Sequence, residues 1–205
     1  MIALRTCLGL RVGAQLLMAL LAVCLARAQY YVPEDIHVHD LPTLTAKSEH
    51  SFDMLAASVA TVLHDKSVCC GSDSAIEDSL ERADKNSLKD IADRLQGRHL
   101  LSDGRPIMVT AEYLPLDQVN SGHLITMLAT DHAPVMMWNS HVYVVHGASY
   151  LKTVDPNSGV VLYAIHKFFL WDTRYADSRR NVTFDRLTED VSKVQGLLFL
   201  DWKPQ

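Results

Sequence analysis

The sequence predicts an α+β fold in which N-terminal helices pack on an antiparallel β-sheet. Apolar residues recur with helical spacing between residues 51 and 97, and strand-like apolar runs follow from residue 105 onward. Two of these runs flank Asp155-Pro156-Asn157-Ser158-Gly159, whose residue types favour a tight turn and therefore a hairpin. Helices that precede an antiparallel sheet along the chain are typical of the α+β class.

Three helices are expected in the first part of the domain. The stretch SFDMLAASVATVLHD, residues 51–65, is apolar on nearly every face, so it predicts a buried helix whose start Ser51 or Asp53 can cap. Residues 72–84 predict a polar helix with one apolar side, and residues 87–97 predict an amphipathic helix that ends at a glycine. The first of the three is the one expected at the centre of the fold.

The second half of the chain predicts the sheet. Its apolar runs are short and are bounded by turn residues, as strands are. Residues 166–172, HKFFLWD, fit either a short helix or a strand. We expect strands at residues 105–114, 133–138, 141–150 and 196–202, a short helix at 122–132, and a hairpin over 150–165.

The N-terminus has the pattern of a secretory signal peptide at residues 1–28. Arg5 and Arg11 precede an apolar run, and Ala26-Arg27-Ala28 places small residues before the cleavage site. The run is shorter than the ~20 residues that a bilayer span needs, so we expect cleavage and no stable membrane span, with a retained anchor as the alternative. The mature protein is then secreted from a bacterial cell or held in its periplasm.

Cleavage leaves an extended arm at residues 29–49 and a single domain at residues 50–205. Loss of the three arginines of the leader moves the formal net charge from −5 to −8. No basic stripe is present, so nucleic acid is not an expected partner, and no cofactor is expected. The remaining cysteines, Cys69 and Cys70, can form a vicinal disulfide, stay reduced, or pair between chains.

Two groups of polar residues have alternative interpretations. His37, His39 and Asp40 can ligate a metal, but they lack a third distant ligand, so we expect a solvated arm and no metal site. The segment at residues 171–186 combines four arginines with three aspartates. An exposed ion-pair network is the favoured interpretation, and an anion-binding site is the alternative. The four arginines are Arg174, Arg179, Arg180 and Arg186.

The motifs P-V-x-x-W, H-V-Y-V-V-H-G and V-D-P-x-x-G, which follow the buried helix, resemble the papain-like cysteine peptidases. The nearest branch is the bacterial, bacteriocin-processing type, and the resemblance covers about residues 50–170. It implies that His141 is the general base and that Asp155, fourteen residues later, orients the imidazole. It also implies a nucleophilic Cys at the N-terminus of the buried helix, where the helix dipole lowers the pKa of a thiol.

The start of that helix departs from the family. Met54 stands where the nucleophilic Cys is expected, and Leu55 stands where a Trp is expected. No Gln lies between Thr43 and Asp53 to donate to an oxyanion. A thioether has no proton to lose, so the resemblance implies a pseudopeptidase.

We therefore expect a domain that binds a peptide or protein partner in a degenerate active-site cleft. Met54, Trp138 and Tyr143 are expected to supply apolar contacts. His141 and Asp155 are expected to be the polar anchors of that cleft.

The alternative is an active thiol hydrolase. It would use Cys69 or Cys70 as the nucleophile together with His141 and Asp155, and Ser51 is a further candidate nucleophile. His141 also has an ordinary interpretation, as a strand-end residue that bonds a turn carbonyl.

Overall fold

A computed structural model describes residues 33–42, 44–46, 51–64, 75–101, 104–155 and 157–205. The compact unit that contains them runs from Pro33 to Gln205. The predicted signal peptide, Cys69 and Cys70 lie outside the described residues. Nowhere in the described part of the chain is a helix both long and apolar enough to cross a membrane.

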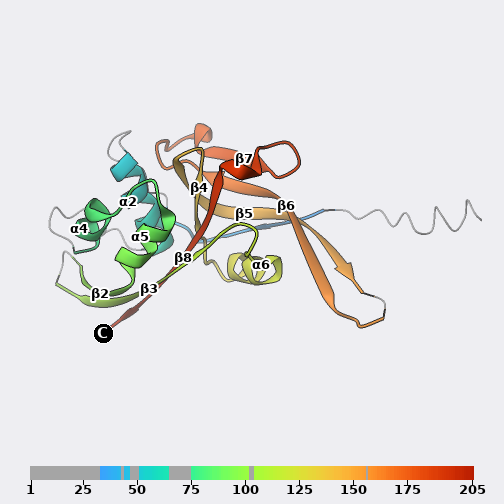
Figure 1. Cartoon of the computed structure of the whole chain (residues 1–205), viewed down its shortest axis with the longest axis horizontal. Helices are drawn as coiled ribbons and strands as arrows, with labels where there is room; N and C mark the ends of the chain where they lie inside the picture. Colours follow the sequence, from blue (N-terminus) through green and yellow to red (C-terminus); the bar gives the residue numbers. More distant parts are fainter. Residues whose placement is uncertain (1–32, 43, 47–50, 65–74, 102–103, 156) are drawn as a thin grey trace, which may run out of the picture. The chain divides into compact units, whose positions relative to one another are not determined.

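The described residues form one eight-stranded antiparallel sheet (Figure 1). Its strands follow the order β2-β3-β8-β4-β5-β6-β7, and β1 pairs with β5 beside that path. In chain order the strands are β1 (Glu34–His37), β2 (Gly97–Leu100), β3 (Pro106–Leu114), β4 (Val135–Trp138), β5 (His141–Val154), β6 (Val161–Trp171), β7 (Asn181–Asp185) and β8 (Val194–Pro204).

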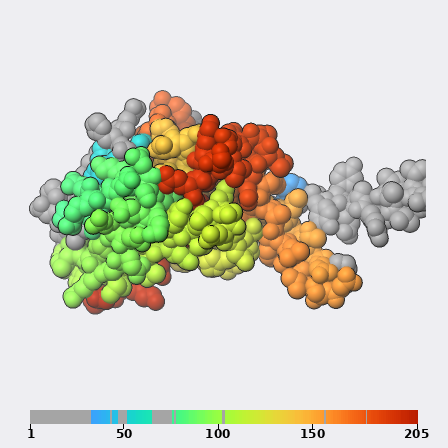
Figure 2. Space-filling view, viewed as in Figure 1, coloured from blue at the N-terminus to red at the C-terminus, as the bar shows by residue number. Residues whose placement is uncertain are grey.

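The β5–β6 hairpin is the longest pairing in the sheet. Val144 pairs with Trp171 at its base, and Val154 pairs with Val161 beside the turn. The turn begins at Asp155, as the sequence predicted, and its backbone N–H donates to the carbonyl of Val160. The far end of this hairpin extends past α6 (Ser121–Ala129), as Figures 1 and 2 show.

β1 anchors the start of the compact unit to the sheet. It pairs antiparallel with β5, and the Tyr150 hydroxyl donates to Glu34 at 2.8 Å. The two strands approach closely at Gly147, where a Cβ atom would lie 2.5 Å from the carbonyl oxygen of Ile36. Part of the expected N-terminal arm is therefore a strand of the sheet.

Among the described residues, four α-helices accompany the sheet, each close to a predicted position. They are α2 (Ser51–Val62), α4 (Ala75–Arg82), α5 (Leu88–Leu95) and α6. Ser87 caps α5 by accepting from the Asp90 N–H, and Asn120 caps α6 by accepting from the His123 N–H. Figure 1 shows α2, α4 and α5 gathered at one end of the sheet and α6 apart from them.

Helices α2 and α6 cover opposite faces of the sheet. In β8 the ring of Phe199 lies 6.1 Å from the ring of His123 in α6, whereas the Trp202 indole donates to the Leu63 carbonyl just after α2. Successive side chains of a strand point to opposite faces, and these two β8 residues are an odd number of positions apart. The helix α2 is buried nearly all round, as the apolar pattern predicted.

The predicted fold class, a papain-like α+β domain with N-terminal helices packed on the sheet, is wrong. The structure is β-rich: an eight-stranded antiparallel sheet dominates and the helices are few and short. Three strands, β1, β2 and β7, were not predicted, whereas the strand alternative for HKFFLWD is confirmed because most of it lies within β6. These additions widen the sheet well beyond the strands that the apolar runs indicated.

Candidate functional site

The structure does not bring His141 and Asp155 together. His141 is the first residue of β5, and Asp155 directly follows its last residue. Fourteen residues of strand at about 3.3 Å each separate the two positions by about 45 Å. The pair therefore forms no base–orienter couple, and the predicted catalytic geometry is wrong for these two residues.

Asp155 has a structural role in the hairpin turn. Its carboxylate accepts hydrogen bonds from the Asn157 N–H at 2.9 Å and from the Ser158 hydroxyl at 2.7 Å. These two bonds lower the pKa of Asp155 below its ordinary value. An aspartate that folds back on the following backbone is a common turn device.

His141 follows the tight β4–β5 turn and is exposed. Asn139 and Ser140, the two turn residues, have positive φ angles of 52° and 62°, which two-residue hairpin turns require. Tyr143, two residues further along β5, is buried with its ring centroid 6.0 Å from that of Trp138. His141 thus occupies an ordinary strand end.

Met54 lies in the first part of α2, and its surroundings are closed. Its side chain is 5% exposed, and its carbonyl accepts from the Ser58 hydroxyl at 2.8 Å and from the Thr173 hydroxyl at 3.2 Å. Thr173 lies two residues after the end of β6, so the segment that follows β6 meets this part of the helix. Met54 provides packing here.

Asp172, which directly precedes Thr173, supplies the carboxylate in this region. It was not among the site residues predicted from the sequence. It is 3% exposed and accepts from Nε of Arg174 at 2.9 and 3.0 Å, with a further bond from Nη2. The bonded carboxylate raises the pKa of Arg174. Burial, and then the Asp172 charge, raise the pKa of Tyr143.

A stacked row of aromatic rings adjoins Asp172. Ring centroids are 4.8 Å apart for His37 and Phe169, 5.7 Å for His37 and His146, and 4.7 Å for His146 and Trp171. The Arg180 guanidinium lies 4.5 Å from the centroid of Trp171. Burial first, and then His37 and Arg180, lower the pKa of His146 to about 4. No set of three His, Cys, Asp or Glu residues within the described ranges is placed to hold a metal.

One Ser–His hydrogen bond is present, but it does not form a nucleophilic site. Ser149 Oγ and His166 Nε2 are 3.2 Å apart, and Ser149 is 5% exposed. The other ring nitrogen of His166 is buried without a hydrogen-bond partner in the described part of the chain, so no carboxylate orients the ring. A buried hydroxyl beside an unoriented imidazole lacks the arrangement that nucleophilic catalysis needs.

An open pocket lies at the other end of α2. It has a volume of about 220 Å³ and is lined by residues 62–64, residues 130–132 and residues 200–202. The first two segments directly follow α2 and α6, and the third belongs to β8. Asp131, Asp201 and Trp202 are among its walls, and the Asp131 carboxylate accepts from the His39 N–H at 2.7 Å.

The groups that border the pocket favour a positively charged ligand. Two helices end at it, and each helix C-terminus has a partial negative charge of roughly −0.5. Neither α2 nor α6 has a basic residue in its last turn to offset that charge. Of the described residues that line the pocket, two are aspartates and none is Lys or Arg.

Backbone geometry fixes both helix ends at the pocket. His64 and Asp131 have positive φ angles of 55° and 61°, which is the left-handed conformation that commonly terminates a helix. The His132 N–H donates to the Met127 carbonyl at 2.9 Å and closes the end of α6. This pocket could not be predicted from local sequence patterns, because three segments far apart in the chain form it.

Family models, curated proteins and solved structures were all compared with this chain, and none of them matches it. The geometry of the described residues is therefore the basis for a proposed function.

Proposed function

We propose that this protein is a binding domain that holds a positively charged group of a peptide or protein partner in the pocket at the C-terminal ends of α2 and α6. The group is a lysine or arginine side chain. One observation supports this above all: Asp131 and the C-termini of two helices without a basic residue in their last turns meet at one open pocket, which has Asp201 in its β8 wall and no Lys or Arg in its described lining.

The walls suit a flat or elongated cation. A hydrogen bond to a charged group contributes roughly 1.5–3 kcal/mol, and the face of an indole such as that of Trp202 can add about 0.5–2 kcal/mol. Trp202 is held in place because its indole N–H donates to the Leu63 carbonyl at 2.6 Å. We expect a dissociation constant on the order of 1 mM for an isolated arginine derivative.

The size of the pocket favours one side chain over a whole small molecule. Pockets for drug-sized ligands occupy roughly 300–1,000 Å³, whereas this one measures about 220 Å³. A partner would insert one basic residue and lay the rest of its chain on the surrounding surface. Affinity for the whole partner would then exceed that for the single residue.

A thiol hydrolase has less support. His141 and Asp155 occupy opposite ends of β5, so they cannot act as a couple on Cys69 or Cys70. We therefore propose binding without catalysis.

We also propose that the protein works outside the bacterial cytoplasm. The basic start, apolar run and small residues of residues 1–28 support export. Mass spectrometry of the protein recovered from the periplasm or medium should show Gln29 as the first residue. Recovery only from the cytoplasm with residues 1–28 attached would contradict export.

The binding proposal is tested by titration with N-acetyl-L-arginine amide, followed by calorimetry and by the Trp202 indole N–H signal in NMR. N-acetyl-L-glutamine amide, which is neutral and has a polar side chain that is shorter by two atoms, is the control ligand. We expect saturable binding of the arginine derivative and a shift of the Trp202 signal. The glutamine derivative should have little effect.

Two conservative variants localise the effect. Asp131→Asn and Asp201→Asn each remove one charge and keep an acceptor oxygen, so each should weaken binding about tenfold, which corresponds to about 1.4 kcal/mol. Asp117→Asn changes an exposed acid outside the pocket and should bind as the wild type does. Equal binding of both ligands, or equal loss in all three variants, would reject the proposal.

A further inference from the structure

Arg180 is an arginine enclosed by the fold. It is the last residue of η1 (Ser178–Arg180) and is 4% exposed. Hydrogen bonds fix its backbone on both sides. The Arg180 N–H donates to the Asp177 carbonyl at 3.0 Å, and the Asp172 N–H donates to the Arg180 carbonyl at 2.8 Å. The side chain is therefore held in place by the end of β6 and the loop after it.

The guanidinium of Arg180 is only partly satisfied. It lies over Trp171, and Nη2 donates to the Leu44 carbonyl at 3.2 Å. Nε and Nη1 are buried and have no hydrogen-bond partner among the residues that the structure describes. It is the only Arg or Lys in that part of the chain with such buried, unpartnered atoms. Unpaired charged donors inside a protein are costly, so they indicate a missing acceptor.

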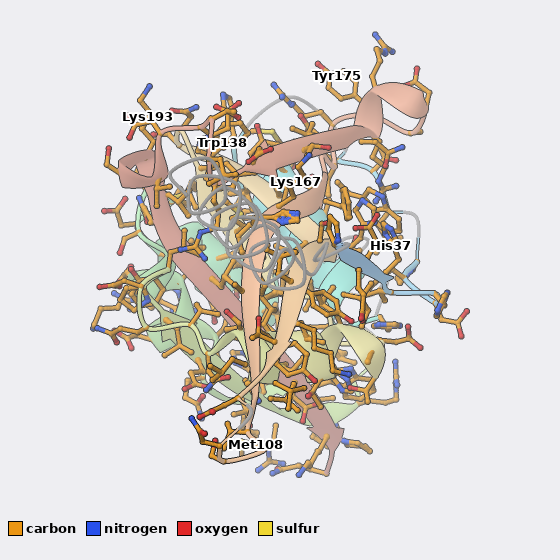
Figure 3. The ribbon with its side chains drawn as sticks, turned by 90° about the vertical axis from the view of Figure 1, so that its right-hand side faces the viewer. His37, Met108, Trp138, Lys167, Tyr175 and Lys193 are labelled. Carbon is orange, nitrogen blue, oxygen red and sulfur yellow. The ribbon has the colours of Figure 1, made fainter. Side chains whose placement is uncertain are left out.

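The acids nearby are already engaged. The Asp172 charge acts on Arg180, but its carboxylate forms its hydrogen bonds with Arg174. Arg179 pairs with Asp177 at 3.0 Å on the surface. Figure 3 labels Tyr175, whose ring lies 5.3 Å from the Arg174 guanidinium and 4.9 Å from that of Arg179. The expected ion-pair network thus forms around Arg174 and Arg179, and it leaves Arg180 out.

We infer that Arg180 is the core of an oxyanion-binding site that takes a carboxylate or a phosphate on its free Nε–H and Nη1–H donors. Arg174, Arg180 and Asp172 together carry one excess positive charge, which a bound anion would neutralise. A guanidinium presents planar donors that match these anions well. The Trp171 ring lies behind the plane of the Arg180 guanidinium and restricts its orientation. Binding of an anion therefore costs little conformational entropy.

This site lies away from the cation pocket. It is linked to the first part of α2 through Asp172 and Thr173, while the pocket lies at the other end of that helix. The eight helical steps from Met54 to Val62, at 1.5 Å each, separate the two positions by about 12 Å along the helix. The inference therefore stands whether or not the pocket binds a basic side chain.

The test is a series of thermal unfolding curves of the mature protein in inorganic phosphate, acetate or chloride at matched ionic strength. We expect phosphate or acetate to raise the midpoint by a few degrees in a saturable manner, and chloride to have no such effect. A response to acetate alone identifies a carboxylate as the ligand, and a response to phosphate alone identifies a phosphate.

Arg180→Met and Arg179→Met form the matched pair of variants. Arg180→Met removes the enclosed charge and should lose the saturable response, whereas Arg179→Met removes an exposed neighbour and should keep it. The pair also separates specific binding from the general stabilisation that excluded anions give to any protein. No saturable response in the wild type, or the same response in Arg180→Met, would overturn the inference.

A spectroscopic measurement keeps the inference testable if Arg180→Met does not fold. The Nε–H signal of Arg180 in the wild type should shift with added oxyanion and saturate at the same concentration as the thermal effect. A signal that stays unchanged up to saturating oxyanion would reject the site.

Discussion

The two ends of α2 differ in burial and in charge. Around its first turns, Thr173 and Ser58 satisfy the Met54 carbonyl, and the charged groups nearby are enclosed with an excess of positive charge. At its last turn the chain opens into a pocket with two aspartates and no compensating Lys or Arg in its described lining. The helix that carries both ends is uniformly apolar, so this difference comes from the segments packed against it.

This contrast shows which charged groups a partner can reach. The buried polar groups at the first end mainly hold the end of β6, η1 and α2 together, and Arg180 there has two buried donors without a partner in the described part of the chain. The open end exposes carboxylates to solvent, where a partner can reach them. A site that resembles a catalytic centre in sequence is thus a structural junction, and the ligand pocket lies at the opposite end.

The largest expected effect is at the closed end. Asp172→Asn should lower the free energy of unfolding by roughly 3–5 kcal/mol, because it leaves the charge of Arg174 without its buried partner. Urea unfolding measures the change. Asp177→Asn, which removes the exposed acid paired with Arg179, is the control and should change stability little. Similar losses in the two variants would contradict the burial contrast.

A smaller effect is expected from pH. The pKa of His146 is about 4 in the folded protein, against 6.5 ordinarily, so the unfolded chain takes up a proton before the folded chain does. Stability from this group is complete above pH 6.5 and declines as the pH falls to 4. The total is on the order of 3 kcal/mol, because each pKa unit between 6.5 and 4 corresponds to about 1.4 kcal/mol.

His146→Phe isolates this contribution. The side chain faces His37 on β1, Phe169 and Trp171 on β6, and the charge of Arg180, and a phenyl ring keeps the stacking. Urea unfolding at pH 7 and pH 4.5 should show a smaller pH-dependent loss in the variant. An identical loss would assign the acid sensitivity to other groups.

The fold could be predicted from the sequence in parts. The apolar pattern of α2 and the turn that starts at Asp155 were confirmed, because each depends on local residue types. The strands β1 and β2 were missed because EDIH and GRHL contain too few apolar residues to show strand periodicity, and β7 was missed because NVTFD alternates over only five residues. Their pairing comes from neighbouring strands, which no single segment reveals.

The functional site was harder to predict than the fold. The separation of His141 from Asp155, however, could have been predicted. A hairpin that turns at Asp155 puts His141 at its base, so the two cannot be neighbours. Because Val144 pairs with Trp171, the next residues outward are Tyr143 and Asp172. The buried role of Arg180 could not be read from a segment with several similar arginines, and burial alone distinguishes it from Arg179.

The smallest effect is expected at Asp155. Asp155→Ala should remove two turn hydrogen bonds at the tip of the hairpin and slightly lower the thermal midpoint. Binding of arginine amide and the response to oxyanions should both be unchanged. Loss of either would show that the hairpin tip communicates with one end of α2.

A crossed titration tests the central claim, that the two ends of α2 bind groups of opposite charge. N-acetyl-L-arginine amide and the effective oxyanion, phosphate or acetate, are each titrated into the wild type, into a double variant with Asp131→Asn and Asp201→Asn, and into Arg180→Met. We predict that the double variant loses only the response to the arginine derivative and that Arg180→Met loses only the response to the oxyanion. Loss of both responses in either variant, or of neither in both, would contradict two separate sites.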